Sequence, residues 1–295
     1  MKTYLEAIWN CRYFWLSLVR MDLRSRYRGS VLGIFWSLLH PIAMTAILCV
    51  VFSCAFGQNL RTYAPLVFTG LTFWGFFTAS AVQGCLCFFQ GEPYIRQHPA
   101  PLAIYPLRNV LGAAFHFIIG LGLAIVIGLI VGPDTGKNPS ATRLMQADLA
   151  TVNDSQSSPG GNPSATRLTQ VLALPSLLVS CILLLLFGWS VSILTGLFSV
   201  RFRDSRYLVE LGLQGLFYLT PVMYRIESFK DKHRLTQLLQ YNPLVAFLDL
   251  IRDPILLGRI PSLTTYACAT TVVLVVAVAA TTALWIDERR LIFHL

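Results

Sequence analysis

Residues 171–199, VLALPSLLVSCILLLLFGWSVSILTGLFS, form an apolar run without a single charged residue. A helix of about 20 apolar residues crosses the hydrocarbon core of a bilayer, so this run is long enough to span a membrane. A helix at the surface of a soluble protein would carry charged residues at helical spacing, and this run carries none. The stretch therefore predicts a transmembrane helix.

The composition of the whole chain agrees with this interpretation. Of its 295 residues, 55% are hydrophobic and only 13% are charged, and the mean hydropathy is +0.61. Soluble domains carry about 25% charged residues, so about half of the usual charge is missing. The remaining charges gather in short segments between long apolar runs. The sequence therefore predicts an all-α integral membrane protein that crosses the bilayer several times.

The apolar runs predict six transmembrane helices, at about 32–56, 65–90, 108–132, 171–199, 207–224 and 263–286. The fifth run is the shortest and contains Glu210 and Gln214, so we expect it to be the span most buried in protein. Residues 243–257 are apolar but too short to cross, and they include Asp249 and Asp253. They predict a short helix on the outer side, between spans five and six.

The segments between the spans complete the expected organisation. Residues 2–24 predict an amphipathic helix in the membrane interface, because Trp9 and Trp15 fall on its apolar side and basic residues on the other. The expected order is an N-terminal cytoplasmic interfacial helix (1–31), spans one to three (32–132) with a cytoplasmic segment at about 92–107, an outer loop (133–170), spans four and five (171–224), short outer helices (225–262), span six (263–287) and a cytoplasmic tail (288–295).

Lysine and arginine positions predict the orientation of the chain. Three segments near span ends are basic: the first has Lys2, Arg12, Arg20, Arg24, Arg26 and Arg28, the second has Arg201, Arg203 and Arg206, and the third has Arg289 and Arg290. With an even number of spans these three segments lie on the same side of the membrane, and the positive-inside rule identifies that side as cytoplasmic. We therefore expect both termini in the cytoplasm, although the long segment 225–262 also carries basic residues on the predicted outer side.

The outer loop has a different composition from the rest of the chain. Residues 133–170 are rich in Pro, Gly, Ser, Thr and Asn, and NPSATRL occurs at 138–144 and again at 162–168. Such a segment cannot bury a core of its own, so we expect it to be disordered. The repeat indicates a tandem duplication, and we expect the loop to have no essential function.

Nothing in the chain predicts a catalytic site. Residues 132–137, GPDTGK, are one spacer short of a phosphate-binding loop, precede Asn138 and follow a predicted span rather than a strand. The cysteines and histidines are not at metal-ligand spacings, and no nucleophile stands beside a base. We expect a transport subunit rather than an enzyme, without a metal or cofactor. The net charge of +9 is better explained by membrane topology than by nucleic-acid binding.

Aromatic residues within the spans are candidates for the lining of a channel. Sugar rings present C–H faces that stack on aromatic side chains, so such a lining would let a glycan slide without tight binding. The alternative is an aromatic belt at the membrane interface, and spacing alone leaves both open. The candidates are Phe35, Trp36, Phe73, Trp74, Phe76, Phe77, Phe217 and Tyr218.

Arg203, Asp204 and Glu210, at or near the start of the fifth span, are expected to be buried polar residues. An ionisable group inside a span is a candidate functional residue. For Glu210 the alternative is a local ion pair with Arg206, which lies four residues earlier and therefore one helical turn away.

Four segments together resemble the ABC type-2 (ABC-2) permease family that exports O-antigen, teichoic acid and related polysaccharides. They are DLRSRYRGSVLGIFWSLLHP (22–41), YIRQHPAPLAIYPLRNV (94–110), RFRDSRYLVELGLQGLFYLTPVMY (201–224) and YNPLVAFLDLIRDPILLG (241–258). Each motif alone is weak, but their order and spacing cover nearly the whole chain. The chain departs from the family at Leu102, where a basic residue is usual, and in its longer outer loop.

The resemblance implies a mechanism and a set of partners. Two copies would form a channel in a bacterial cytoplasmic (inner) membrane, and two cytoplasmic ATPase subunits would bind ATP and Mg. The coupling contact to the ATPases would involve Tyr94, Ile95, Arg96, Pro101 and Pro106. The substrate would be a long glycan on a polyprenyl diphosphate. Its diphosphate, or lipid head groups, would contact Arg24, Arg26 and Arg28, for which topology determination is the alternative role.

Three other functions are weighed against this one. An exporter of drugs or small lipids would favour a large outer domain or few aromatics near the pore, and the sequence shows neither. A membrane-embedded glycosyltransferase would need a constellation of acids; Asp249 and Asp253 are candidates, but Arg252 beside them indicates structural pairing. A secondary transporter would place charged groups at the membrane midplane in discontinuous helices, which only Glu210 and Gln214 approach.

Overall fold

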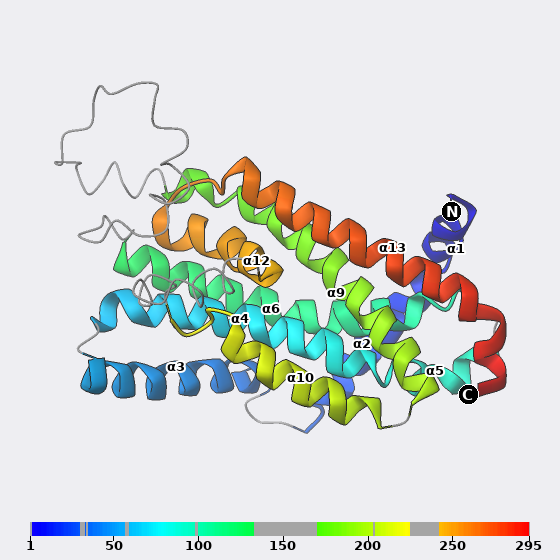
Figure 1. Cartoon of the computed structure of the whole chain (residues 1–295). Coiled ribbons are helices and arrows are strands. Elements are labelled where there is room, and N and C mark those ends of the chain that lie inside the picture. Colours follow the sequence, from blue (N-terminus) through cyan, green and yellow to red (C-terminus); the bar gives the residue numbers. More distant parts are fainter. Residues whose placement is uncertain are drawn as a thin grey trace.

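Every regular element that the computed structural model describes is a helix (Figure 1). The description covers residues 2–29, 33, 35–56, 59–97, 100–132, 170–202, 204–224 and 242–294. The elements are α1 (Lys2–Asn10), α2 (Arg12–Tyr27), α3 (Phe35–Phe56), α4 (Leu60–Gly84), α5 (Cys87–Ile95), α6 (Ile104–Val131), α9 (Ser176–Arg201), α10 (Ser205–Leu219), α12 (Pro243–Arg252), η2 (Asp253–Leu257) and α13 (Leu263–His294). The duplicated outer loop and Arg203 lie outside these ranges.

Five helices in the described part of the chain are long and apolar enough to cross a membrane. They cover Phe35–Ala55, Leu60–Gly84, Ile104–Val131, Gln170–Arg201 and Leu263–Asp287. These helices confirm five of the six predicted spans, with shifted ends. The predicted second span is divided into α4 and α5 at Cys85–Leu86, and the third begins four residues earlier than predicted.

The predicted fifth span, 207–224, corresponds to α10, which is too short to cross. Its 15 residues cover about 22 Å, against about 30 Å of hydrocarbon. The helix ends because Thr220, which precedes Pro221, is extended at φ −104° and ψ 133°, as is usual for a residue before proline. The expectation that this segment is the most buried is also wrong, because only Ser205 and Leu213 of α10 are buried.

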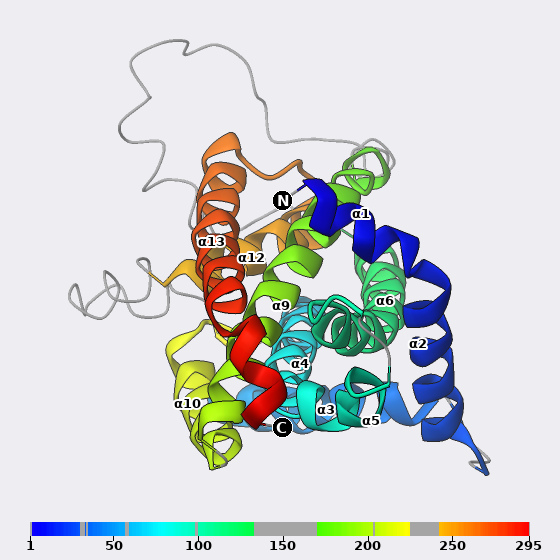
Figure 2. The ribbon, with the colours of Figure 1, turned by 90° about the vertical axis from the view of Figure 1, so that its right-hand side faces the viewer.

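The N-terminal segment also differs from its prediction. In place of one amphipathic helix there are two, α1 and α2, which meet at Cys11. Leu18 and Val19 of α2 are buried, and α2 packs along α6 (Figure 2). The contact with α6 covers only a narrow apolar stripe on α2. Most of the polar side of α2 therefore stays exposed.

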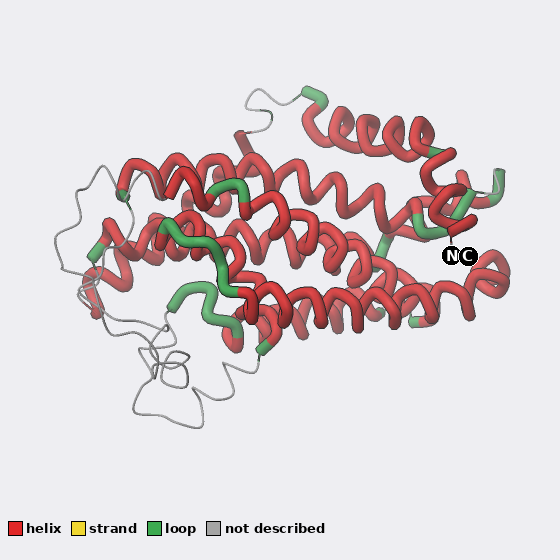
Figure 3. The backbone as a smooth tube through the Cα atoms, turned by 90° about the horizontal axis from the view of Figure 1, so that it is seen from above, coloured by secondary structure: helices red, strands yellow, loops and turns green. Residues whose placement is uncertain are grey.

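The helices run so that several predicted cytoplasmic segments meet at one end of the bundle. The helix α1, the helix α5, the turn between α9 and α10 and the C-terminal end of α13 lie at that end (Figures 1 and 3). The helix α12 lies toward the opposite end. The helix α1, the turn between α9 and α10 and the C-terminal end of α13, which belong to the basic segments used to predict orientation, therefore share one end of the molecule.

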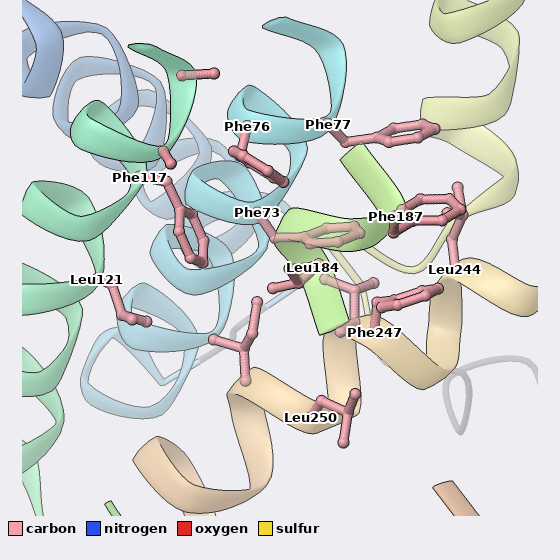
Figure 4. Packing of buried hydrophobic residues seen from close by; sticks show 14 of the residues in the cluster. Phe73, Phe76, Phe77, Phe117, Leu121, Leu184, Phe187, Leu244, Phe247 and Leu250 are labelled. Carbon is pink, nitrogen blue, oxygen red and sulfur yellow. The ribbon is translucent and has the colours of Figure 1, made fainter. Parts of the chain in front are cut away.

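A core of aromatic rings joins α4, α9 and α12 (Figure 4). The rings of Phe187 and Phe247 stack with centroids 4.6 Å apart, and Phe77 stacks on Phe187 at 5.5 Å. At Gly84 a Cβ atom would lie 2.4 Å from Oγ1 of Thr195, so α4 and α9 approach closely only because this residue is glycine. Small residues at such crossings are typical of helix packing in membranes.

The buried side chain of Arg252 fixes the end of α10. Its Nη1 donates to the carbonyl oxygen of Pro221 at 2.8 Å, and its Nη2 donates to the carbonyls of Val222 at 2.7 Å and Leu66 at 3.1 Å. The bonds to Pro221 and Val222 satisfy carbonyls that follow the end of α10, and the bond to Leu66 links this turn to α4. Asp253, one of the acids beside Arg252, pairs with Arg259 at 3.2 Å.

Candidate functional site

A cavity of about 1080 Å³ lies among α2, α3, α4, α6 and α10. Pockets for small ligands usually measure about 300–1,000 Å³, so this one is large enough for a sizeable ligand. Aromatic residues and a few charged or titratable residues share its lining. The aromatic members are Tyr27, Trp36, Trp74, Phe76, Phe117, Phe217 and Tyr218, and the charged or titratable members are Arg26, His40, His116, Arg206 and Glu210.

One wall of the cavity consists of aromatic rings from two helices. Trp74 of α4 and Phe217 of α10 have ring centroids 5.3 Å apart, and Phe217 meets Tyr218 edge-on at 5.5 Å. Tyr218 is 68% exposed, and Trp36 of α3 is 55% exposed. These rings therefore offer faces and edges that a ligand can contact without displacing the core.

Arg26 lies on the opposite side of the cavity lining and is held by α6. Its Nη1 contacts Nε2 of His116 at 3.0 Å, and the Tyr27 hydroxyl contacts Nδ1 of the same ring at 2.9 Å. Nearby, Arg108 of α6 donates through Nε and Nη2 to both carboxylate oxygens of Asp22 in α2. Three polar side-chain pairs therefore attach α2 to the spanning helix α6.

The ion pair expected from the spacing of Arg206 and Glu210 is present. The Arg206 Nε donates to Oε1 of Glu210 at 2.9 Å, and both side chains are partly exposed and line the cavity. Glu210 is therefore a cavity-lining group rather than a buried one. Asp204 is exposed at the start of α10, so the prediction that it is buried is wrong.

The remaining predicted channel residues divide into two groups. Phe73 and Phe77 are 0% and 6% exposed and belong to the aromatic core, so they do not line this cavity. Phe35 is exposed but lies outside the cavity lining, as do Arg24 and Arg28. Of the arginine cluster, only Arg26 lines the cavity. The structure thus brings Arg26, Trp36, Trp74, Phe76, Phe217, Tyr218 and Glu210 together.

The predicted coupling residues extend from the end of α5 to the first turn of α6. Arg96 is exposed and pairs with Glu92 through Nη2 at 2.8 Å, and Ile95 is half-buried. Tyr94 meets Phe14 of α2 edge-on, with ring centroids 6.0 Å apart. Pro101 is half-buried, and Pro106 is buried in the first turn of α6. This segment is therefore packed against the N-terminal helices while its arginine faces outward.

Sequence reasoning missed His116 as a site residue. The histidines lack metal-ligand spacing, so the sequence selects none of them as a ligand, yet His116 lies inside a predicted span. The rule that singles out Glu210, an ionisable group within a span, also applies to His116. Its partners Arg26 and Tyr27 lie about 90 positions away in the chain, and sequence periodicity carries no information about such contacts.

The fold and cavity together define a multi-pass helical membrane protein with a large, aromatic-walled cavity at one side of its helices. In the described ranges, no three histidine, cysteine or acidic side chains are arranged to hold a metal ion. The membrane-length helices and the large cavity are typical of a membrane transport subunit.

Comparison with known proteins identifies homologues of one kind. The chain is 24% identical over 243 residues to an O-antigen export system permease protein RfbA of Klebsiella pneumoniae, covering 82% of this chain and 80% of the relative. A second RfbA of that species is 24% identical over 247 residues, and the RfbA of Myxococcus xanthus is 22% identical over 244 residues. No family model matches the chain. The resemblance to polysaccharide-exporter permeases is confirmed by this homology, as is the prediction of a transport subunit.

Proposed function

We propose that this chain is the permease subunit of an ATP-driven exporter that moves an O-antigen-type polysaccharide across the bacterial cytoplasmic membrane. The observation that carries the proposal is the homology to three O-antigen export permeases over about four-fifths of the chain. Five membrane-length helices agree with that role. The chain would act as a homodimer with two cytoplasmic ATPase subunits that bind ATP and Mg.

The cavity supports a glycan carried on a polyprenyl diphosphate as the substrate. Trp36, Trp74 and Tyr218 present ring surfaces on which sugar C–H faces can stack. The buried hydroxyl of Thr78 also lines the cavity and makes no hydrogen bond within the described residues, so a sugar hydroxyl would satisfy it. Arg26 supplies a cation for the diphosphate, while Arg24 and Arg28 face outward, where head groups of anionic lipids would meet them.

Coupling to the ATPase would use the segment around 92–107. Arg96 is exposed and directly follows α5. The helix α5 lies at the end of the bundle where both chain termini lie, which suits a contact with a cytoplasmic subunit (Figure 1). The Tyr94–Phe14 contact, together with a hydrogen bond from the Ala103 amide to the Tyr4 hydroxyl at 3.4 Å, links this segment to α1 and α2. A push on this segment would therefore move the helix that carries Arg26.

A deletion experiment tests this function directly. Cells without the gene are expected to lose the surface polysaccharide and to accumulate the lipid-linked glycan inside, and the wild-type gene restores export. As a matched control, a Val275→Ala variant, altered on an exposed apolar face of α13 away from the cavity, restores export equally. Unchanged surface polymer without intracellular accumulation would remove the export function.

A further inference from the structure

The three arginines before the first span differ in what surrounds them. Arg24, Arg26 and Arg28 are all exposed, but only Arg26 lines the cavity, where its Nη1 lies 3.0 Å from Nε2 of His116. The other arginine of the lining, Arg206, is paired with Glu210. Among the described residues no carboxylate pairs with Arg26, so its charge makes the described lining positive at this place.

The chemistry of the contact determines the form of the His116 ring. A guanidinium group has only N–H donors, so Nε2 of His116 must be the acceptor and carries no proton. In the neutral ring the proton is then on Nδ1, which donates to the Tyr27 hydroxyl at 2.9 Å. His116 thus accepts from Arg26 on one side and donates to Tyr27 on the other, which fixes both side chains relative to α6.

This contact uses one of the five N–H donors of the Arg26 guanidinium, whose side chain lines the cavity. Planar guanidinium groups bind phosphate oxygens through pairs of such donors, and they do so more strongly when held in place. The ion pair between Asp22 and Arg108 fixes the preceding turn of α2 to the same helix. Two of the requirements of a built anion site, a charge without an acidic partner and a fixed position, are therefore met.

We propose that Arg26 is the group of this cavity that binds a phosphate-bearing ligand, and that His116 is the positioning residue that holds Arg26 for this purpose. The inference rests on the proposed function, because the diphosphate of the lipid-linked glycan would be that ligand. The same phosphate chemistry is present in the head groups of anionic phospholipids, which are the second possible source.

Binding measurements on the purified full-length chain in phosphatidylcholine nanodiscs test the proposal. The probe is geranylgeranyl diphosphate, followed by calorimetric titration. Wild type is expected to bind it, and Arg26→Gln is expected to bind about tenfold to a hundredfold more weakly, the usual loss for a charge-assisted contact. The matched controls Arg24→Gln and Arg28→Gln are expected to stay within about twofold of wild type.

The role of His116 is tested by rescue and by a double-mutant cycle. His116→Phe removes the acceptor and is expected to weaken binding about as much as Arg26→Gln, whereas His116→Gln keeps an acceptor and a donor and restores most of it. In Arg26→Gln/His116→Phe the two losses are expected not to add, because His116 acts through Arg26. Additive losses, or a His116→Gln variant as weak as His116→Phe, would overturn the positioning role.

Two further experiments are needed. The first distinguishes the lipid-linked diphosphate from phospholipid head groups as the ligand, and the second distinguishes failure of this inference from failure of the proposed function. In nanodiscs that contain phosphatidylglycerol, the affinity for the diphosphate is expected to stay within about threefold of its value in phosphatidylcholine. Strong competition by this lipid alone would assign the site to head groups and overturn the substrate assignment. If Arg26→Gln binds the probe as tightly as wild type while cells still need the gene for export, the phosphate site is refuted and the proposed function stands. If the variants bind as expected but deletion of the gene leaves export unchanged, the proposed function is refuted and the phosphate site stands.

Discussion

The helix α10 and the turn that follows it lie in very different surroundings. The turn at 220–222 is buried against Arg252 and α4, and its Val222 belongs to the aromatic core. In α10 itself, the side chains of Arg206, Glu210 and Tyr218 are partly or largely exposed and line the cavity. Packed aromatic cores resist rearrangement because each ring fills the space left by its neighbours. The comparison indicates a rigid half, formed by the turn and the core, that supports a cavity able to admit a ligand.

The largest expected effect comes from breaking the rigid half at Arg252. Replacing it by leucine removes the donor to three buried carbonyls. The folded state is expected to lose about 3–5 kcal/mol, because the buried carbonyls of Pro221 and Val222 lose their donor. Thermal unfolding in detergent measures the loss. Arg96→Gln, whose side chain is 60% exposed in its pair with Glu92, is the control, with an expected loss of less than about 0.5 kcal/mol. Equal stability of Arg252→Leu and wild type would show that the turn does not depend on this side chain.

A pair of aromatic substitutions sharpens the contrast between core and cavity. Phe187→Ala, in the stacked core, is expected to cost about 3–5 kcal/mol. Tyr218→Ala, at a ring 68% exposed to the cavity, is expected to cost less than about 1 kcal/mol and yet to reduce glycan export several-fold. Unfolding midpoints and surface-glycan assays on both variants measure the two effects. A Tyr218→Ala variant that unfolds like Phe187→Ala would place Tyr218 in the core instead.

A pH titration examines the packing of α12. Burial, with the nearby charge of Asp253 as the second cause, raises the pKa of Asp249 to about 7. The folded state then binds a proton that the unfolded state releases near pH 4, so stability is expected to fall as pH rises from about 4 to about 7. Asp249→Asn should flatten that part of the profile of unfolding midpoint against pH. An unchanged slope in Asp249→Asn would assign the pH dependence to other groups.

The smallest effect on stability, with a large one on transport, is expected at the coupling segment. Arg96 pairs with Glu92 at a site where its side chain is 60% exposed, so Arg96→Gln is expected to change stability by less than about 0.5 kcal/mol. Replacing Arg96 or Tyr94 should uncouple ATP hydrolysis from export in the assembled exporter. ATPase rate and glycan export are measured side by side. Intact export in both variants would refute the coupling role.

Much of the fold follows from sequence because a bilayer imposes simple requirements. Apolar length alone predicts five of the spans, and the i,i+4 spacing predicts the pair of Arg206 with Glu210. The length of the fifth apolar run does not reveal that its helix ends before Pro221. Ending a helix inside the protein costs free energy, and Arg252, from a distant segment, offsets this cost by donating to the carbonyl of Pro221. Hydropathy patterns hold no information about such a partner.

The candidate site is predicted less well, for a related reason. Aromatic residues on α4 look alike in sequence, but Phe73 and Phe77 lie in the core while Trp74 and Phe76 also line the cavity. Which ring faces which side depends on how α4 is rotated against α9 and α10. The separation of Arg26 from Arg24 and Arg28 depends in the same way on His116, a residue about 90 positions away.

Crosslinking in living cells gives the most direct test of the cavity as the path of the glycan. A photoreactive benzoylphenylalanine is placed at Trp74 in the cavity wall, or at Ile182, which is 58% exposed on α9 and lies outside the cavity lining. In cells that export the polymer, the Trp74 position is expected to capture the lipid-linked glycan and the Ile182 position is not. Capture at Ile182 alone, or none at Trp74 in a variant that still exports, would contradict the proposed path.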